Sequence, residues 1–235
     1  MPTAPHPFTH CLRLAWLTCA LLAGTAAAQG TQREQEIAQC LPHELQTWPD
    51  GRDRAAVAVP LHLAYRHDGA PPWFNAAMVL GTVQRAASAW SACGVPVQVQ
   101  ALHAGQRPPP GAVLVLWSDA ASGAHFGLAN LRTLNLALGP AAFELLKRHN
   151  PGHPAADTLQ MVVSHEMGHF FGLMAHSRRC VDVMSYYDNG KGERCFTRDG
   201  RQPSARGDDR ALLPTACDIA RCRALNSDSL AVRGP

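Results

Sequence analysis

The sequence predicts a mixed α/β (α+β) fold: a mixed, twisted β-sheet with a backing helix, a second helix that carries a histidine motif, and a small irregular C-terminal part with one helix. Two observations lead to this prediction. Segments with a two-residue hydrophobic period alternate with segments of helical period from residue 55 to residue 172. Beyond Met184 the chain is polar and rich in glycine and arginine, apart from one helical pattern.

The first strands and the backing helix follow from local patterns. Residues 55–65 have strand character. Near the end of this segment, Leu61, Leu63 and Tyr65 alternate with His62 and Ala64. Residues 75–93 place their large apolar side chains on one face of a helix, and Gly94 stands where a C-cap belongs. Residues 95–102 alternate as a strand. Residues 112–117 (AVLVLW) are apolar throughout, which is typical of a central strand covered on both faces.

Three further elements complete the expected sheet layer. We expect two short strands around 126–131 and 133–138, followed by a short helix over 140–149. The N-terminal part therefore runs strand, helix and then several strands.

The motif-bearing helix is expected to begin at Asp157. Asp157 and Gln160 have the spacing of a capping box, and apolar residues follow at helical intervals. Gly172 should end this helix. A final helix is expected over 214–225.

The N-terminus has the features of a cleavable secretory signal. An apolar stretch from Leu14 is too short to span a bilayer, and small residues at 26–28 suit a signal peptidase. We therefore expect residues 1–28 to be a signal peptide, 29–54 to be an N-terminal segment, and the mature protein to be secreted or periplasmic, with no membrane anchor after signal removal.

The charge balance excludes some classes of partner. With 21 basic and 18 acidic residues, the chain lacks the excess charge that favours nucleic acid or an anionic membrane. We expect no nucleic-acid partner, and we expect a monomer.

Six cysteines follow the predicted signal peptide, and an even number in an exported chain favours disulfides over zinc thiolates. Cys217 and Cys222 are five residues apart in a predicted helix, so they should not bond to each other. We expect Cys40 to pair with Cys93, with two further bridges among the last four cysteines. These four are Cys180, Cys195, Cys217 and Cys222.

Residues 165–169 (HEMGH) predict a zinc site. His165 and His169 are four residues apart and share one helix face, so both imidazoles can bind one zinc ion at about 2.0–2.1 Å. Glu166 is rotated by about 100° and can reach a water beside the metal. This is the arrangement of HExxH metalloproteases, and the alternative is a pair of surface histidines.

Around this motif the sequence resembles the metzincin clan of zinc peptidases, whose signature is HExxHxxGxxH followed by a Met-turn. His165, Glu166, His169 and Gly172 match in register, whereas the third histidine, His176, is displaced by one residue. One extra residue adds at most about 3.3–3.6 Å of chain, so we expect His176 to be the third ligand. The alternatives are His125, His149 or His153 from distant loops, Asp182, or a solvated His176.

The resemblance implies further roles. Met184 would form a Met-turn beneath the three imidazoles, and Tyr186 would lie beside the metal as a ligand or a hydrogen-bond donor to the reaction intermediate. Residues 123–130 would form the rim that pairs with the substrate backbone. The peptidase domain would comprise 55–235, with an upper subdomain (55–172) and a lower one (173–235).

These features predict a secreted zinc-dependent metalloendopeptidase that acts on protein or peptide substrates. Glu166 would assist the attack of a water that Zn²⁺ activates. A non-catalytic secreted zinc module and a zinc amidase acting on cell-wall peptide are the alternatives. Cys40 is expected to form a structural disulfide, because the residues around it do not resemble the switch sequence with which matrixins silence their zinc.

Overall fold

The sheet has five strands in the order β2-β1-β3-β5-β4. The computed structural model describes residues 1, 31–186, 188–200 and 209–231, and the sheet belongs to the compact unit that begins at Gln32. Strands β1, β2, β3 and β5 are parallel, whereas the edge strand β4 is antiparallel to β5. The strands are β1 Leu61–Tyr65, β2 Val97–Ala101, β3 Val113–Trp117, β4 Gly127–Asn130 and β5 Asn135–Leu138. The predicted mixed sheet is confirmed.

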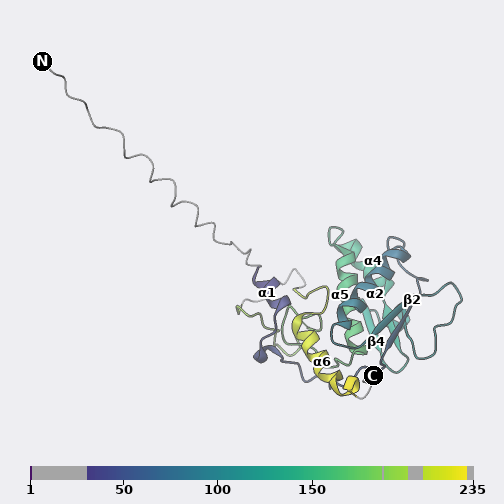
Figure 1. Ribbon diagram of the computed structural model, residues 1–235. Coiled ribbons are helices and arrows are strands. Elements are labelled where there is room, and N and C mark those ends of the chain that lie inside the picture. Colours follow the sequence, from purple (N-terminus) through teal and green to yellow (C-terminus); the bar gives the residue numbers. More distant parts are fainter. Residues whose placement is uncertain (2–30, 187, 201–208, 232–235) are drawn as a thin grey trace. The chain divides into compact units, whose positions relative to one another are not determined.

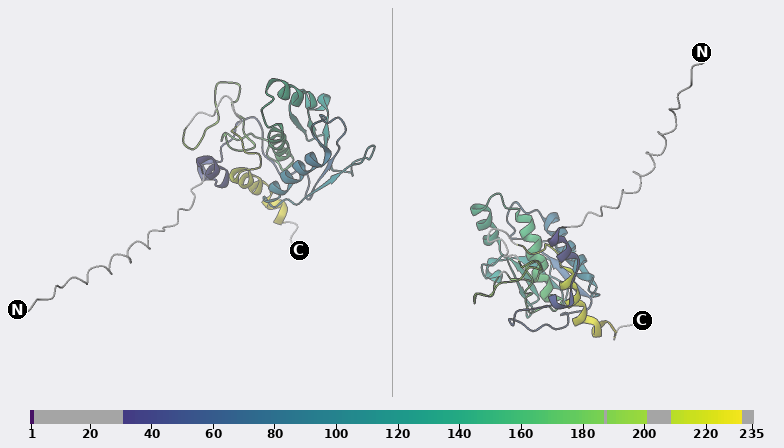
Figure 2. Two further views of the ribbon diagram at one scale, coloured as in Figure 1. Left: turned by 90° about the horizontal axis from the view of Figure 1, so that it is seen from above. Right: turned by 90° about the vertical axis from the view of Figure 1, so that its left-hand side faces the viewer.

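Six α-helices and one 3₁₀-helix are described, and two of the α-helices, α2 and α5, lie side by side against the sheet (Figures 1 and 2). The helices are α1 Gln32–Ala38, η1 Pro42–Glu44, α2 Ala76–Ser91, α3 Asp119–Ser122, α4 Pro140–His149, α5 Ala155–Phe170 and α6 Ala216–Ala231. Helix α2 is the predicted backing helix, α5 carries the histidine motif, and α6 is the predicted final helix.

The main core fills the space between α2, α5 and the sheet. Trp90 of α2 is completely buried, stacks on Phe171 and donates a hydrogen bond from Nε1 to the carbonyl of Ser164 in α5 (2.9 Å). Burying a large apolar side chain stabilises a fold by about 1.5–3 kcal/mol. This contact therefore anchors the middle of α5, next to the histidine motif, to the backing helix.

Two local predictions were wrong. Residues 55–60 form no strand, because the amide of Val57 donates to the carbonyl of Phe170 at the end of α5 instead of to a strand. The capping box of Asp157 and Gln160 is absent, since α5 begins at Ala155 and the Gln160 side chain accepts from Arg85 of α2. A capping box of this kind lies instead at Thr215 and Asp218, at the start of α6.

Residues 112–117 were predicted to be covered on both faces, but in β3 fully buried side chains alternate with half-buried ones. Strand β3 is nevertheless central in the sheet, as predicted.

Three disulfides join the six cysteines: Cys40–Cys217, Cys93–Cys222 and Cys180–Cys195. The predicted Cys40–Cys93 bridge is wrong, because both cysteines bond to α6 instead. Of the two bridges expected among the last four cysteines, only Cys180–Cys195 is present. Cys217 of α6 faces the N-terminal segment, and Cys222 faces the end of α2, where Arg223 also donates to the carbonyl of Ala92. Cys217 and Cys222 do not bond to each other, as predicted.

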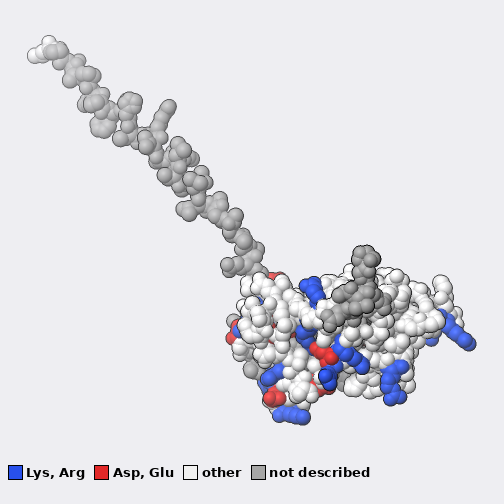
Figure 3. Space-filling model, turned by 60° about the horizontal axis from the view of Figure 1, so that its bottom comes forward, with Lys and Arg blue, Asp and Glu red and all other residues white. Residues whose placement is uncertain are grey.

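The disulfides fit the predicted exported protein, since such bonds persist in oxidising compartments. No helix in the described ranges combines the length and the apolar character of a membrane span. Residues 2–28 of the predicted signal peptide lie outside the described residues. On the face drawn in Figure 3, basic side chains lie scattered and several stand beside acidic ones.

Candidate metal centre

Helix α5 places two histidines on one face, one turn apart. The ring centroids of His165 and His169 are 5.3 Å apart, and both residues are buried. Between them, Gly168 lets α2 and the turn after the motif approach the helix, because a Cβ at this position would lie 2.7 Å from Cζ2 of Trp90 and would collide with Met184. A small residue is therefore required on the inner face of the motif.

The chain reverses directly after α5. Gly172 has φ +102°, a conformation that favours glycine, and its amide donates to the carbonyl of His169 (3.1 Å). This turn brings His176 back towards the helix. Its ring centroid lies 5.1 Å from that of His165 and 5.2 Å from that of His169, so the three imidazoles form a nearly equilateral triangle.

Each Nδ1 atom of the triangle faces a hydrogen-bond acceptor. Nδ1 of His165 lies 2.7 Å from the carbonyl oxygen of Val183, and Nδ1 of His169 lies 2.8 Å from that of Leu173. Nδ1 of His176 lies 2.8 Å from a carboxylate oxygen of Asp50. A carbonyl or carboxylate oxygen only accepts, so each Nδ1 carries the proton. The lone pair of each neutral ring is therefore on Nε2.

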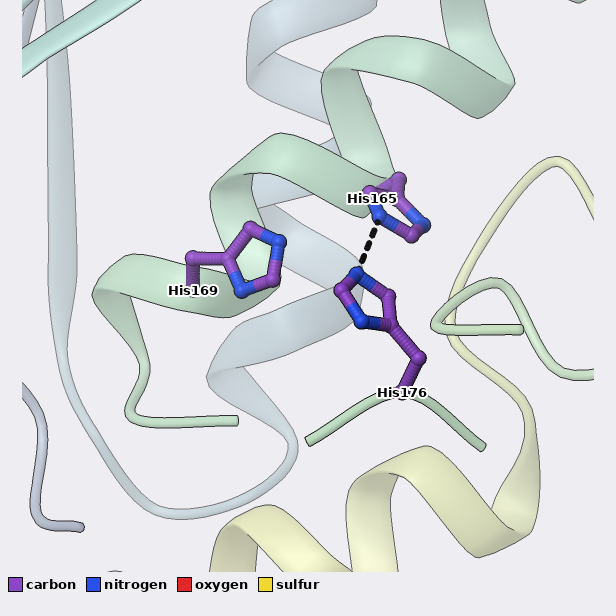
Figure 4. Close-up of side chains that lie close together, drawn as sticks. All are labelled: His165, His169 and His176. Atoms are coloured by element: carbon purple, nitrogen blue, oxygen red, sulfur yellow. Dashed lines mark hydrogen bonds between the residues drawn. The ribbon is translucent and has the colours of Figure 1, made fainter. Parts of the chain in front are cut away.

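The Nε2 lone pairs converge. Nε2 of His165 and Nε2 of His176 are 3.2 Å apart, the contact drawn as a dashed line in Figure 4. A hydrogen bond across this contact would require one ring to hold a second proton. Two nitrogens bound to one tetrahedral ion at about 2.0–2.1 Å would be about 3.3 Å apart. The three donor nitrogens all lie within 4.8 Å of one another, so His165, His169 and His176 could hold one metal ion.

The surroundings keep the triangle neutral. Burial lowers the pKa of His165 well below its usual value, and the neighbouring rings of His169 and His176 lower it further. Burial, followed by the charge of His176, lowers the pKa of His169 to about 4. The pKa of His176 is also lowered, mainly by burial, although its bond to Asp50 opposes this. Neutral imidazole is the form that binds a metal.

Glu166 is held against the sheet edge. Its Oε2 accepts a hydrogen bond from the amide of Ala129 in β4 (2.8 Å), and a Cβ on Gly127 would lie 2.8 Å from its Cγ. Burial raises the pKa of Glu166 to about 7, against the lowering effects of the Ala129 bond and of the charge on Arg210. A carboxylate with this pKa can exchange protons near neutral pH.

Met184 and Tyr186 both lie close to the triangle. Met184 is fully buried and packs against the backbone of α5 at Gly168. Tyr186 is 41% exposed and stacks on His176, with ring centroids 3.7 Å apart at 21°. Partial burial and the negative charge of Glu166 raise the pKa of the Tyr186 hydroxyl.

The alternative ligands do not join the triangle. Within the described residues, the histidine group that could hold an ion contains neither His125, His149 nor His153. The carboxylate of Asp182 is engaged elsewhere, because it accepts from Ser177 and Thr215 and pairs with Arg179.

Elsewhere in the part of the chain that the structure describes, one other group of ligand-type side chains lies close together: Cys40, Glu44 and Cys217. The two cysteines form a disulfide and offer no thiolate, which is the form that binds metals. Glu44 is paired with Arg198. This group is therefore not a metal site.

The sequence reasoning missed the three acceptors behind the triangle. The acceptors at the Nδ1 atoms are Asp50, Leu173 and Val183. Leu173 and Val183 accept through backbone carbonyls, which every residue has, so the residue type does not reveal them. Asp50 lies 126 residues before His176, and its Asp-Gly context suggests only a turn.

No protein-family model matches the chain, and no curated protein matches it either. Among solved structures, the chain is similar to one in the GM1-bound form of the ECX AB5 holotoxin, with a TM-score of 0.43 and 14% sequence identity. The match covers 80% of this chain and 91% of the other. A similarity of this strength supports no argument about fold family or function.

Proposed function

We propose that the protein is a secreted zinc-dependent metalloendopeptidase, with His165, His169 and His176 as the zinc ligands and Glu166 as the general base. One observation carries the proposal: three imidazoles present converging Nε2 lone pairs, and the carboxylate of Glu166, the residue after His165, is fixed by the amide of Ala129. Three protein ligands leave a coordination position open, which is typical of catalytic zinc and not of structural zinc.

A metzincin-like architecture is part of the proposal. Its support is the antiparallel edge strand β4 beside α5, the reversal of the chain at Gly172, and Met184 packed beneath the motif helix. Strand β4 would pair with the substrate backbone, because an edge strand can add one more strand.

Held by His165, His169 and His176, zinc would lower the pKa of a water molecule and polarise a peptide carbonyl as a Lewis acid. Glu166 supplies the proton transfers. The amide of Ala129 fixes the carboxylate through Oε2, so Oε1 would take a proton from the water as the water oxygen bonds to the peptide carbonyl carbon. The same carboxyl then gives that proton to the leaving amine. The peptide C–N bond would break when the amine nitrogen is protonated. Tyr186 lies against His176 at the exposed side of the triangle, where its hydroxyl can donate a hydrogen bond to the oxyanion.

The central test is Glu166→Gln, which keeps the size of the side chain and its bond to Ala129 but removes the base. General-base catalysis contributes about 10²–10⁴-fold, so cleavage of denatured casein should fall by at least about 10²-fold. Bound zinc, measured by atomic emission on the same sample, should remain at one ion per chain.

Glu144→Gln is the matched control, because Glu144 is an exposed residue of α4. This variant should match the wild type in zinc content and in cleavage. A Glu166→Gln protein that cleaves casein as fast as the wild type would refute the assignment. A wild type that binds zinc and cleaves cell-wall stem peptides but no unrelated protein would favour the amidase alternative.

A further inference from the structure

The loop that carries His176 is bound along its length by the N-terminal segment. The amide of Arg54 donates to the carbonyl of Gly172 (3.0 Å), and the amide of Trp48 donates to the carbonyl of His176 (2.8 Å). Between these two bonds, Oδ1 of Asp53 accepts from the amides of Met174 (2.8 Å) and Ala175 (2.9 Å). Both ends and the middle of the loop are therefore fixed from the same side.

Asp50 is the residue of this segment that touches an imidazole. Its Oδ1 accepts from the backbone amide of His176 (3.0 Å), and its Oδ2 lies 2.8 Å from Nδ1 of the same residue. The two contacts fix both the backbone and the ring of His176. Asp50 is also part of the surface, since its side chain is 34% exposed, whereas that of His176 is 10% exposed.

We propose that Asp50 is a positioning residue of the metal centre, which makes the N-terminal segment 48–54 part of that centre. The carboxylate holds the proton of His176 on Nδ1 and directs Nε2 towards the other two imidazoles. An acceptor behind a metal-binding histidine fixes the tautomer, and its loss typically weakens metal binding by about 10–100-fold. The inference rests on the proposed metal centre, but not on the peptidase reaction.

The test compares Asp50→Asn with Asp53→Asn. The two substitutions are chemically identical and three residues apart, and Asp53 holds the same loop and pairs with Arg221 without touching an imidazole. In competition with a chromophoric chelator, Asp50→Asn should bind zinc about 10–100-fold more weakly than the wild type. Asp53→Asn loosens the same loop but keeps the Asp50–His176 contact, so its loss of zinc affinity should be clearly smaller than that of Asp50→Asn.

The second readout is the tautomer of His176 in the metal-free protein, measured from its imidazole ¹⁵N chemical shifts. In the wild type, Nδ1 should carry the proton. In Asp50→Asn this preference should weaken, because the amide group of Asn can also donate to Nδ1. If Asp50→Asn does not fold, the wild-type spectrum decides: a proton on Nδ1 supports the proposal and a proton on Nε2 overturns it.

The remaining outcomes separate the two proposals. Equal zinc affinity in the wild type and Asp50→Asn overturns the role of Asp50, and so does an equal loss in Asp53→Asn, which would indicate general loosening of the loop. A wild type that binds no zinc overturns the metal centre and the role of Asp50 together. If the wild type binds zinc and Asp50→Asn binds it weakly, but neither cleaves peptides, the role of Asp50 is supported and only the peptidase proposal fails.

Discussion

Replacing Glu44 with Gln should remove a pH-dependent part of the stability. The Glu44 carboxylate is 1% exposed, accepts two hydrogen bonds from Arg198 (2.7 and 2.9 Å) and one from the amide of Leu41 (2.9 Å), and lies 3.7 Å from Arg179. Burial alone would raise its pKa. The bonds from Arg198 and Leu41, and the charges of both arginines, outweigh burial and lower the pKa to about 2, from 4.5.

The sign and the size of the effect follow from this difference. The folded-state pKa is depressed, so the contribution is complete above the unfolded pKa of 4.5 and disappears as the pH falls towards about 2. At about 1.4 kcal/mol per pKa unit, the contribution is about 3 kcal/mol at neutral pH. Because Arg198 is 20% exposed and solvent screens the pair, we expect a loss of about 2–3 kcal/mol in Glu44→Gln.

The assay is urea unfolding of both proteins in the presence of a chelator, which removes any contribution of bound metal. The difference in unfolding free energy between wild type and variant should be about 2–3 kcal/mol near pH 7 and should shrink steadily below about pH 4.5. Groups other than Glu44 titrate in both proteins and cancel in the difference. A difference that stays constant from neutral to acidic pH would show that the pKa of Glu44 is not depressed in the folded protein.

Two further substitutions and the removal of one disulfide test other parts of the molecule. Gly127→Ala should push β4 away from Glu166 and lower the free energy of unfolding by about 1–3 kcal/mol. Turnover should fall while the zinc content is retained. Unchanged turnover would show that β4 does not position the carboxylate. Removing the Cys93–Cys222 bridge should cost about 4 kcal/mol in denaturant unfolding, because with Cys40–Cys217 intact it closes a loop of about 60 residues. A smaller loss than for Cys180–Cys195, whose cysteines are 15 residues apart, would contradict the loop-entropy argument. Tyr186→Phe keeps the stacked ring but loses the hydroxyl, so kcat should fall about 10-fold or more at constant zinc content; an unchanged kcat would leave Tyr186 with a packing role.

The parts of the fold that the sequence predicted are those set by short-range patterns. Strand β2, helix α2 and the end of α5 follow from hydrophobic period and from one glycine, and the structure places them within a few residues of expectation. His165, Glu166 and His169 lie within five residues of one helix, so their mutual placement is local too. For these elements, burial of one face is enough to decide the structure.

The parts that could not be predicted depend on contacts between distant segments. The partner of Cys40 is Cys217 of α6, which is 177 residues away in the sequence. The residues around the two cysteines do not indicate that they bond to each other. The capping-box spacing at Asp157 does not produce a capping box. The side chain of Gln160 accepts a hydrogen bond from Arg85 of α2 and does not cap its own helix. In both cases tertiary packing decided between alternatives that were locally equivalent.

The displaced third histidine shows why motif spacing alone does not define such a site. The position of His176 depends on hydrogen bonds between two segments. The segment 48–54 binds the backbone carbonyl and amide groups of the loop that begins at Gly172. A loop supported in this way can contain an additional residue. Asp50 fixes the position of His176, so this position does not depend on the number of residues in the loop. The segment 48–54 supplies this constraint from outside the loop, so the three imidazoles lie together with three residues between Gly172 and His176.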